Sequence, residues 1–335
     1  MSHSIPTPGA ARISLALLAV VPAGLAFSGA FSGAYPWQST RAYWLIGIAV
    51  AALILLFGWW RGLHFTTILR RRLAIVSRGG RPVPEPDANT RTTALLRLGP
   101  ASSATGALPL PLVERYLNCY GIRADSIRIT SRHNGSGATD TWIGLTLSAV
   151  DNLAALQARS ARIPLHETAE VAARRLADHL REIGFDANTV AAEDVPEVLS
   201  FESGSTTRET WRSVQQASSD YVAAYRIRVD DGLPETLAEV RAQQAREIWT
   251  ALEIADSGTH HTVAAACALR TDAAPGGAAP VTGLTLERGN QRPALQALDP
   301  LSTRRLDGHA QLPADLLERL DWPAAQGQSE TLSRT

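Results

Sequence analysis

The first 60 residues contain two long apolar runs. Residues 13–40 carry no charged side chain, and neither do residues 42–60. Each run supplies the ~20 residues that a helix needs to cross a hydrocarbon core of ~30 Å. Aromatic residues, which favour the headgroup level, lie at both ends of the second run. We therefore expect residues 1–60 to form a membrane domain with two transmembrane helices, at about 13–31 and 42–60.

A basic amphipathic stretch follows the second apolar run. In helical register, most apolar residues of HFTTILRRRLAIVSR (64–78) share one stripe, and three consecutive arginines fall largely off it. We predict an amphipathic basic juxtamembrane helix over 61–80 that lies on anionic lipid or packs against another protein. The candidate membrane-interface and assembly residues are Trp59, Trp60, Arg61, Phe65, Ile68, Leu69, Arg70, Arg71, Arg72 and Leu73.

The rest of the chain predicts one large domain. A proline-rich linker over 81–91 precedes it, and a flexible tail over 323–335 follows it. Within 92–322, strand patterns are interspersed with helix patterns, which predicts an α/β domain of the α+β type with a mixed sheet. The predicted strands are 92–98, 126–133, 139–150, 211–219, 221–229, 247–256, 261–270 and 281–288, and the predicted helices are 109–121, 166–184, 234–245, 290–300 and 313–322.

The distribution of charge predicts the orientation in the membrane. The first 84 residues carry eight arginines and no acidic residue, whereas the remaining residues carry 24 arginines and all 32 acidic residues. Most of the early arginines follow Trp60, so the positive-inside rule predicts a multi-pass protein of the inner membrane whose large domain is cytoplasmic. A cleaved signal peptide is an alternative for the first run, because small residues follow it. The second run would then give the same orientation.

Composition excludes several classes of protein. The sequence contains no lysine, so it has no Walker A lysine, no kinase-type strand lysine and no Schiff-base lysine. After residue 84, the 24 arginines and 32 acidic residues give a net charge of −8. A domain with this charge does not offer the basic surface that nucleic acid requires.

The histidines do not form a recognisable metal motif. The sequence HETAE at His166 begins like a zincin helix, but Glu170 stands where the second histidine is required. His260 and His261 are adjacent between two predicted strands, where a turn is expected, because neighbouring residues of a strand point to opposite faces. We therefore expect no metal site and no bound cofactor.

Three other patterns were considered for catalysis. Asp230 and Asp231 lie between a predicted strand and a helix, where they could hold a metal–nucleotide complex or cap the helix. Cys119 and Cys267 are far apart and are interpreted as buried reduced thiols, with a nucleophile as the alternative. The sequence GSG at 135–137 is too short to hold a phosphate. Together these residues do not make a catalytic set.

Two segments resemble a known family. WWRGLHFTT (59–67), which follows the second apolar run, and GLTLERGNQRPALQALDP (283–300) are similar to the corresponding regions of EccE, a membrane component of mycobacterial type VII (ESX) secretion systems. Two apolar runs followed by a large domain also match the layout of that family. The resemblance implies an inner-membrane complex with EccB, EccD and the ATPase EccC. It also implies a cytoplasmic domain similar to a nucleotide-sugar transferase fold without its active site.

Three interpretations of function follow. The first is a non-catalytic structural or assembly subunit of a secretion complex, with protein partners and membrane lipid but no nucleic acid. The alternative is a membrane-anchored, cytoplasmic-facing enzyme similar to a glycosyltransferase, for which Asp230 and Asp231 are the candidate residues. A signalling module with a small-molecule site is the third, and no motif supports it.

Overall fold

A computed structural model gives the arrangement of the chain. It describes residues 59–60, 63–78, 90–101, 107–135, 137–159, 164–199, 207–217, 219–258 and 260–325. These residues belong to two compact units, Met1–Ser77 and Arg78–Thr335, which are considered separately. The predicted transmembrane helices lie outside the described residues, apart from the last two residues of the second. No helix among the described ranges has the length and apolar character needed to cross a membrane.

The first unit contains a short hairpin and a helix. Strand β1 (Trp59–Trp60) pairs antiparallel with β2 (Leu63–His64), and α3 (Phe65–Arg78) follows directly. Helix α3 lies within the stretch 61–80 that was predicted as a helix, and it begins four residues later than predicted. Trp59 and Trp60 are in a strand rather than at the end of a helix. Aromatic residues favour strands, and Gly62 disfavours a continuous helix through this point.

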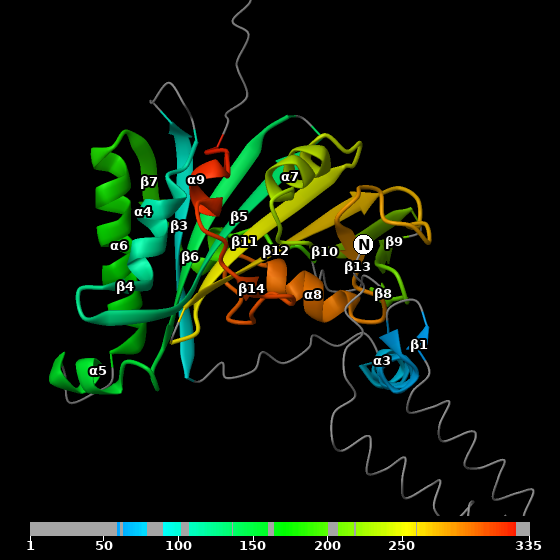
Figure 1. Ribbon diagram of the computed structural model, residues 1–335, viewed down its shortest axis with the longest axis horizontal. Helices are drawn as coiled ribbons and strands as arrows, with labels where there is room; N and C mark the ends of the chain where they lie inside the picture. The colour runs from blue at the N-terminus through cyan, green and yellow to red at the C-terminus, as the bar shows by residue number, and fades with distance from the viewer. Residues whose placement is uncertain are drawn as a thin grey trace, which may run out of the picture. The chain divides into compact units, whose positions relative to one another are not determined.

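The second unit is built on one large sheet. Among the described residues the sheet has twelve strands, with β7-β3-β6-β5-β11-β12-β10-β9-β8 as the main path and with β4, β13 and β14 pairing beside it (Figure 1). The strands are β3 (Arg91–Ala101), β4 (Asn118–Cys119), β5 (Ile122–Asn134), β6 (Thr139–Ser148), β7 (Phe185–Thr189), β8 (Arg208–Glu209), β9 (Val214–Ala217), β10 (Asp220–Ile227), β11 (Glu247–Asp256), β12 (His261–Thr271), β13 (Leu284–Leu286) and β14 (Ala310–Gln311).

Helices cover both faces of this sheet. They are α4 (Leu110–Glu114), η2 (Arg115–Leu117), α5 (Leu153–Arg159), α6 (Leu165–Glu182), η3 (Ala192–Asp194), α7 (Leu233–Arg241), α8 (Gln291–Leu298) and α9 (Leu316–Arg319). Apolar residues of α4, α6, α7 and α9 pack with one set of strand side chains, on what we call the first face. Residues of α8 and of the loops around 195–199 and 301–306 pack with the alternate set, on the second face.

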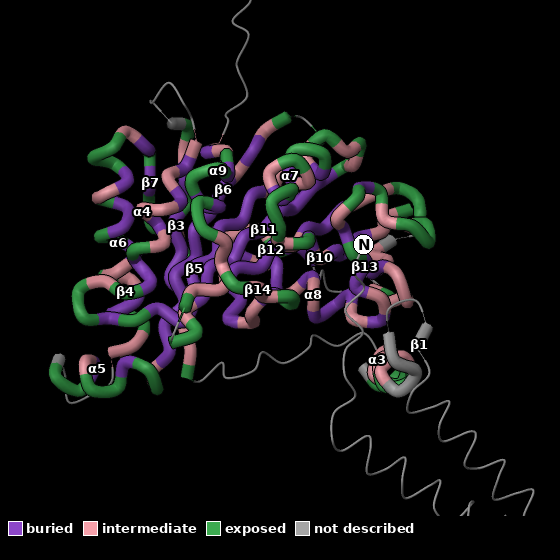
Figure 2. The backbone as a smooth tube through the Cα atoms, viewed as in Figure 1, coloured by how far each residue is buried: buried purple, intermediate pink, exposed green. Residues whose placement is uncertain are grey.

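The central strands are buried on both sides, as the continuous purple of β5, β6 and β11 in Figure 2 shows. In β11, Ile248, Leu252 and Ile254 belong to the core of the first face, whereas Trp249 and Ala251 belong to the core of the second. This division follows from the two-residue repeat of a strand. A sheet enclosed in this way has little surface for a solvent-facing active site on its central strands.

The fold class is α+β, as predicted. Every ladder between described strands is antiparallel. The parallel pairing that a mixed sheet would contain is limited to the isolated bridge between Pro100 and Ala325. The predicted edges of the domain were slightly too narrow: Arg91, assigned to the linker, opens β3, and Pro323 pairs with Ala107. The remainder of the predicted linker and tail lies outside the described residues, except for Thr90 and the last residues before 326.

A buried ion pair fixes the segment that crosses the second face after α8. We call residues 299–309 the crossing segment. Arg128 of β5 and Glu253 of β11 are almost fully buried, and two guanidinium nitrogens of Arg128 lie 3.0 and 2.5 Å from Glu253 Oε2. Burial alone would raise the pKa of Glu253, but Arg128 and His309 outweigh it and hold this pKa below its usual value. The carboxylate is therefore ionised.

Both partners of this pair also hold the crossing segment. Arg128 donates to the carbonyl oxygens of Asp299 (3.2 Å) and Ser302 (2.9 Å), and to that of Arg304. Glu253 accepts from the backbone nitrogen of Leu306 at 3.3 Å and from the ring of His309 at 3.2 Å. Since an ionised carboxylate only accepts hydrogen bonds, the Nε2 atom of His309 must carry the hydrogen.

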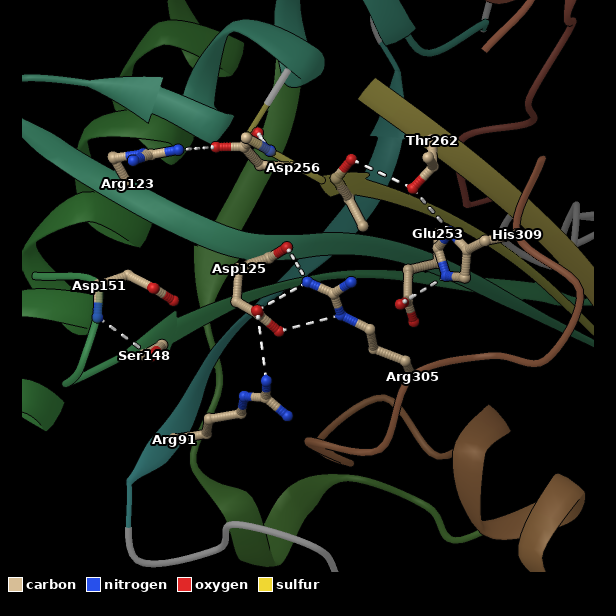
Figure 3. A network of polar contacts seen from close by, with 12 residues as sticks. Arg91, Arg123, Asp125, Ser148, Asp151, Glu253, Asp256, Thr262, Arg305 and His309 are labelled. Atoms are coloured by element: carbon tan, nitrogen blue, oxygen red, sulfur yellow. Dashed lines mark hydrogen bonds and ion pairs between the residues drawn. The ribbon is translucent and has the colours of Figure 1, made fainter. Parts of the chain in front are cut away.

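A second ionic cluster holds the same segment near the beginning of β5. Arg305 donates to both carboxylate oxygens of Asp125, at 2.7 and 3.3 Å, and Arg91 of β3 lies 3.5 Å from the same carboxylate. Figure 3 shows Asp125 between these two guanidinium groups, with Glu253 and His309 farther along the sheet. The crossing segment is thus attached to β5 and β11 by charged groups rather than by apolar packing alone.

We predict that Arg128→Met lowers the free energy of unfolding by about 3–5 kcal/mol, because it leaves a buried carboxylate without its counter-charge. The double variant Arg128→Met with Glu253→Gln should recover only part of this loss. The carbonyls of Asp299, Ser302 and Arg304 still lack the guanidinium donor, at about 1–3 kcal/mol for each group left unsatisfied. Urea denaturation of the full-length protein in mild detergent measures these differences.

The matched control is Arg97→Met, which removes the exposed ion pair with Asp140 and should cost no more than about 1 kcal/mol. A double variant as stable as the natural protein would contradict the view that Arg128 acts on the crossing segment, and would reduce its role to neutralising Glu253.

Candidate functional site

Helix α3 presents an apolar stripe to its surroundings. The side chains of Leu69, Leu73 and Val76 are 49%, 61% and 80% exposed. Their spacing of four and three residues places them on one face of the helix. A stripe of large exposed apolar side chains marks a surface for protein or lipid. The prediction that the helix is amphipathic is thus consistent with the exposure of Leu69 and Leu73, while the surface that covers them stays a prediction.

The structure gives less detail for the other predicted assembly residues. Arg70 and Arg72 are exposed on α3, and Arg71 and Ile68 are partly buried. Helix α3 carries no acidic residue, so a cationic surface lies beside its apolar stripe. Of Trp59, Trp60 and Phe65 the backbone is described and the side chains are not. Arg61 lies outside the described residues.

The zincin-like sequence at the start of α6 forms a local polar network. His166 lies 3.3 Å from Glu170 through Nε2, and its Nδ1 atom lies 3.2 Å from the hydroxyl of Thr92. Glu170 also pairs with Arg174 at 2.9 Å. Both ring nitrogens of His166 are engaged by the chain itself. These residues tie the exposed side of α6 to the beginning of β3.

The two adjacent histidines separate as expected. His261 begins β12 and its Nδ1 atom lies 2.7 Å from Glu114 of α4. His260 lies in the turn before it, where its carbonyl oxygen accepts hydrogen bonds from Ser257. Within the described ranges, no group of three or more histidine, cysteine or acidic residues is arranged to hold a metal ion.

The acidic pair at the end of β10 serves the turn into α7. Asp230 accepts from the backbone nitrogen of Gly232 at 3.0 Å, and Arg228 lies 3.8 Å away. Asp231 is largely exposed and pairs with Arg319 of α9 at 2.9 Å. Asp230 therefore holds the turn before α7, and Asp231 joins this turn to α9. Of the two roles considered from the sequence, the structural one describes their contacts.

The two cysteines have different environments. Cys267 is fully buried in β12, and burial raises the pKa of its thiol far above the usual range. A thiol that does not ionise is a poor nucleophile, so this residue is structural, as expected. Cys119 in β4 is only partly buried. It lies at the wall of a pocket next to α6.

Gly135 and Gly137 lie between strands β5 and β6. Gly137 has a φ of 83°, in the left-handed region that favours glycine. The side chain of Asn134 accepts from the backbone nitrogen of Ala138 at 3.1 Å. These contacts are those of a turn between two antiparallel strands.

The segment at 283–300 forms part of the second face. Gln291 is fully buried at the start of α8, where its side chain bonds to the backbone of Ala224 in β10 and to the carbonyl of Glu287. Arg292 is also buried. Gly289 has a φ of 68° and lies against the ring of Trp211, which a β-carbon at this position would strike. The distinctive residues of this segment therefore have structural roles: Gln291 attaches α8 to the sheet, and Gly289 lets the chain lie against Trp211.

The buried charges at the centre of the sheet are not apparent from the sequence pattern alone. A charged residue inside the otherwise apolar strand EIWTALEIAD was the available signal for Glu253, and an arginine between two isoleucines in SIRITSRH was the signal for Arg128. His309 and Arg305 lie in a segment without regular periodicity. Their role depends on contacts more than 50 positions away in the sequence, which local patterns do not reveal.

His133 is the histidine whose titration the fold changes most clearly. It lies near the end of β5, with Nδ1 2.7 Å from the hydroxyl of Thr139 and with Nε2 buried and without a hydrogen-bond partner. Burial, and secondarily the charge of Arg241, lower its pKa from 6.5 to about 4. His133 is thus neutral in the folded protein at neutral pH.

Comparison with known proteins gives consistent matches. The sequence model of the family described as "Putative type VII ESX secretion system translocon, EccE" matches residues 136–227. Over 325 residues the chain is 60% identical to the ESX-3 secretion system protein EccE3 of Mycobacterium tuberculosis, covering 96% of this chain and 94% of that relative. It is 49% identical over 301 residues to EccE3 of Mycolicibacterium smegmatis, covering 90% of this chain and 91% of that relative.

The depressed pKa of His133 makes stability depend on pH. Between pH 6.5 and about 4 the unfolded chain binds a proton at this residue and the folded chain does not. The contribution of neutral His133 to the free energy of unfolding is fully present above pH 6.5. It is lost as the pH falls from 6.5 to about 4. We predict that His133→Asn, which can keep the bond to Thr139, loses less stability than the natural protein over the same window. Parallel curves of unfolding free energy against pH would contradict this, and His166→Asn at an exposed position is the control.

Proposed function

The chain belongs to the EccE family of type VII ESX secretion proteins, and we propose that it is a non-catalytic subunit that supports assembly of a secretion complex in the inner membrane. The observation that carries this proposal is the exposed apolar stripe of α3. Leu69, Leu73 and Val76 expose large apolar side chains immediately after the segment with membrane-like composition. A partner or a lipid surface covers such a stripe in the functional state.

The contacts of the candidate catalytic residues support the same proposal. The carboxylate of Asp230 holds a turn, and that of Asp231 joins this turn to α9. His166 pairs with Glu170 of its own helix, and His261 pairs with Glu114 of α4. Cys267 is protonated in the core. Each residue thus has a structural role in the fold. In this proposal, the sheet between the two helical layers supports the outer surfaces of the domain and does not line a reaction site.

The partners and the topology are part of the proposal. The chain spans the inner membrane twice, at about 13–31 and 42–60, with the large domain in the cytoplasm. It assembles with EccB, EccC and EccD subunits, EccC supplying the ATPase. Helix α3 lies at the inner leaflet, where its arginines contact anionic headgroups and its apolar stripe packs against protein.

We predict that the two surfaces of α3 contribute unequally to assembly. Replacing Arg70, Arg71 and Arg72 by glutamine removes about 3 kcal/mol of attraction to the lipid surface at most, so assembly should fall only partly. Leu69→Asp with Leu73→Asp places two carboxylates in an apolar contact and should abolish most of it. The measurement is the fraction of the protein that comigrates with the secretion complex after mild detergent extraction.

The control for this experiment is Thr67→Asp with Ala74→Asp, which adds the same charge away from the stripe at 3.6 residues per turn. This control should assemble better than the leucine variant. If the glutamine variant fails while the leucine variant assembles normally, the contact of α3 is electrostatic and the packed-helix proposal is wrong.

The topology has its own test. We predict that a reporter active only in the cytoplasm works when it is fused after Thr335, and that a reporter active only outside the inner membrane does not. The physical reason is the excess of arginine that follows Trp60. The reverse pattern of reporter activity would overturn the orientation and, with it, the placement of α3 at the inner leaflet.

A further inference from the structure

A pocket opens beside α6, on the first face of the sheet. Its walls are the amino-terminal half of α6 on one side and the η2–β4 turn on the other. In Figure 1, β4 and α4 lie next to α6 at one end of the sheet. The pocket has a volume of about 230 Å³. This is below the ~300–1,000 Å³ of sites for drug-sized ligands, so its size fits a single large side chain better than a cofactor.

The floor of the pocket is part of the apolar core. Ile122, Leu145 and Leu147 line it and are buried on strands β5 and β6. Thr168 and Ala172 of α6 form the adjoining wall. An apolar side chain that enters the pocket would be removed from water and would contact apolar residues of the protein core. This is the arrangement in which a single anchor residue contributes most to an interface.

The mouth of the pocket is formed by residue types that are enriched at interfaces. Tyr120 is 59% exposed, and its backbone has a φ of 55°, in the left-handed region that residues other than glycine rarely adopt. The guanidinium of Arg175 lies 4.3 Å from the centre of its ring, and the ring of Tyr116 lies 6.4 Å away, edge to face. Strained backbone that holds an exposed aromatic ring in place is typical of binding sites.

Two charged residues at the mouth of the pocket, Glu167 and Arg175, determine which charges a bound partner must carry and in which order. Glu167, Val171 and Arg175 all line the pocket and follow one another at four-residue steps on α6. Glu167 and Arg175 are therefore ~12 Å apart along the axis, with Val171 between them. Among the described residues neither charge has an opposite charge within ion-pairing distance. This surface is complementary to a base, an apolar residue and an acid in that order.

We infer that this pocket is a docking site for a helix of another subunit of the secretion complex. The helix inserts one leucine, isoleucine or phenylalanine side chain between α6 and Tyr120. A basic residue of the helix lies opposite Glu167, and an acidic residue about eight positions away lies opposite Arg175. The inference rests on the proposed function, because it takes the partner to be a member of the same assembly.

A photo-crosslinking amino acid in place of Val171 tests the location. It is incorporated in the full-length protein, the assembled complex is illuminated, and the crosslinked peptide is identified by mass spectrometry. The expected product is a segment of another subunit with the base–apolar–acid order. The control position is Ile183, which is similarly exposed beyond the end of α6 and outside the pocket, and it should not capture this segment.

Charge exchange tests the recognition. Glu167→Arg with Arg175→Glu keeps the net charge and reverses the order, so it should reduce retention of the crosslinked subunit at least ~10-fold. Asp178→Arg with Arg181→Asp exchanges another exposed pair on the same helix and should have no such effect. Reversing the matching base and acid of the identified segment should restore retention.

The outcomes separate this inference from the proposed function. If the protein assembles and the Glu167/Arg175 exchange has no effect, the docking site is wrong and the assembly role stands. A crosslink from position 171 only to residues 326–335 of the same chain, only to a second copy of the chain, or to no protein also overturns the docking site. If the natural protein does not migrate with a larger complex at all, the proposed function itself fails.

Discussion

The second unit depends on the pairing of Arg128 with Glu253 in the middle of the sheet. Two ions removed from water cost several kcal/mol each, and their mutual attraction alone rarely offsets this. Here the same groups also bind three carbonyl oxygens, a backbone nitrogen and His309 of the crossing segment. The charges are therefore satisfied only when residues 299–309 lie in one place. Their contribution is to select a single arrangement of the second face, more than to add net stability.

This selection extends to the neighbouring elements. Asp299 joins the carboxyl end of α8 to the loop at Val198, whose backbone nitrogen donates to its side chain at 2.7 Å. Gly144 of β6 has no side chain at the point where the carbonyl of Pro300 lies against it, and a β-carbon there would stand 2.8 Å from that oxygen. The segment 283–300, which resembles the EccE family, thus ends next to Asp299, the first residue of the crossing segment that Arg128 contacts. A domain held in this way keeps its outer surfaces in fixed positions, as the proposed assembly role requires.

The sequence was sufficient to predict those helices and strands whose pattern of apolar residues matches their burial in the fold. The limits of β11 agree with the prediction, because a doubly buried strand reads as a continuous apolar run ended by polar residues. Helix α6 was equally clear from its apolar spacing and Gly184. The helix predicted over 109–121 ended early because Tyr120 and Gly121 both adopt positive φ and form a turn. Helix α5 and strand β7 were missed. Strand β7 owes its structure to its pairing with β3 at the sheet edge and to its packing on α6. Tertiary context also explains why the buried charges and the pocket mouth could not be predicted.

Two separate surfaces on one chain change the energetics of assembly. The stripe of α3 and the pocket beside α6 belong to different units, and each offers only a few apolar side chains. Taken alone, contacts of this size give weak association, because binding must first offset the loss of translational and rotational freedom. Once one contact holds the chain at the complex, the second becomes intramolecular, with an effective concentration in the millimolar range for a short linker. Strong retention then needs no large interface, and a defect at either surface weakens the whole attachment. Under the two proposals, the subunit joins its complex through the sum of modest contacts, while the interior of the domain holds its own shape.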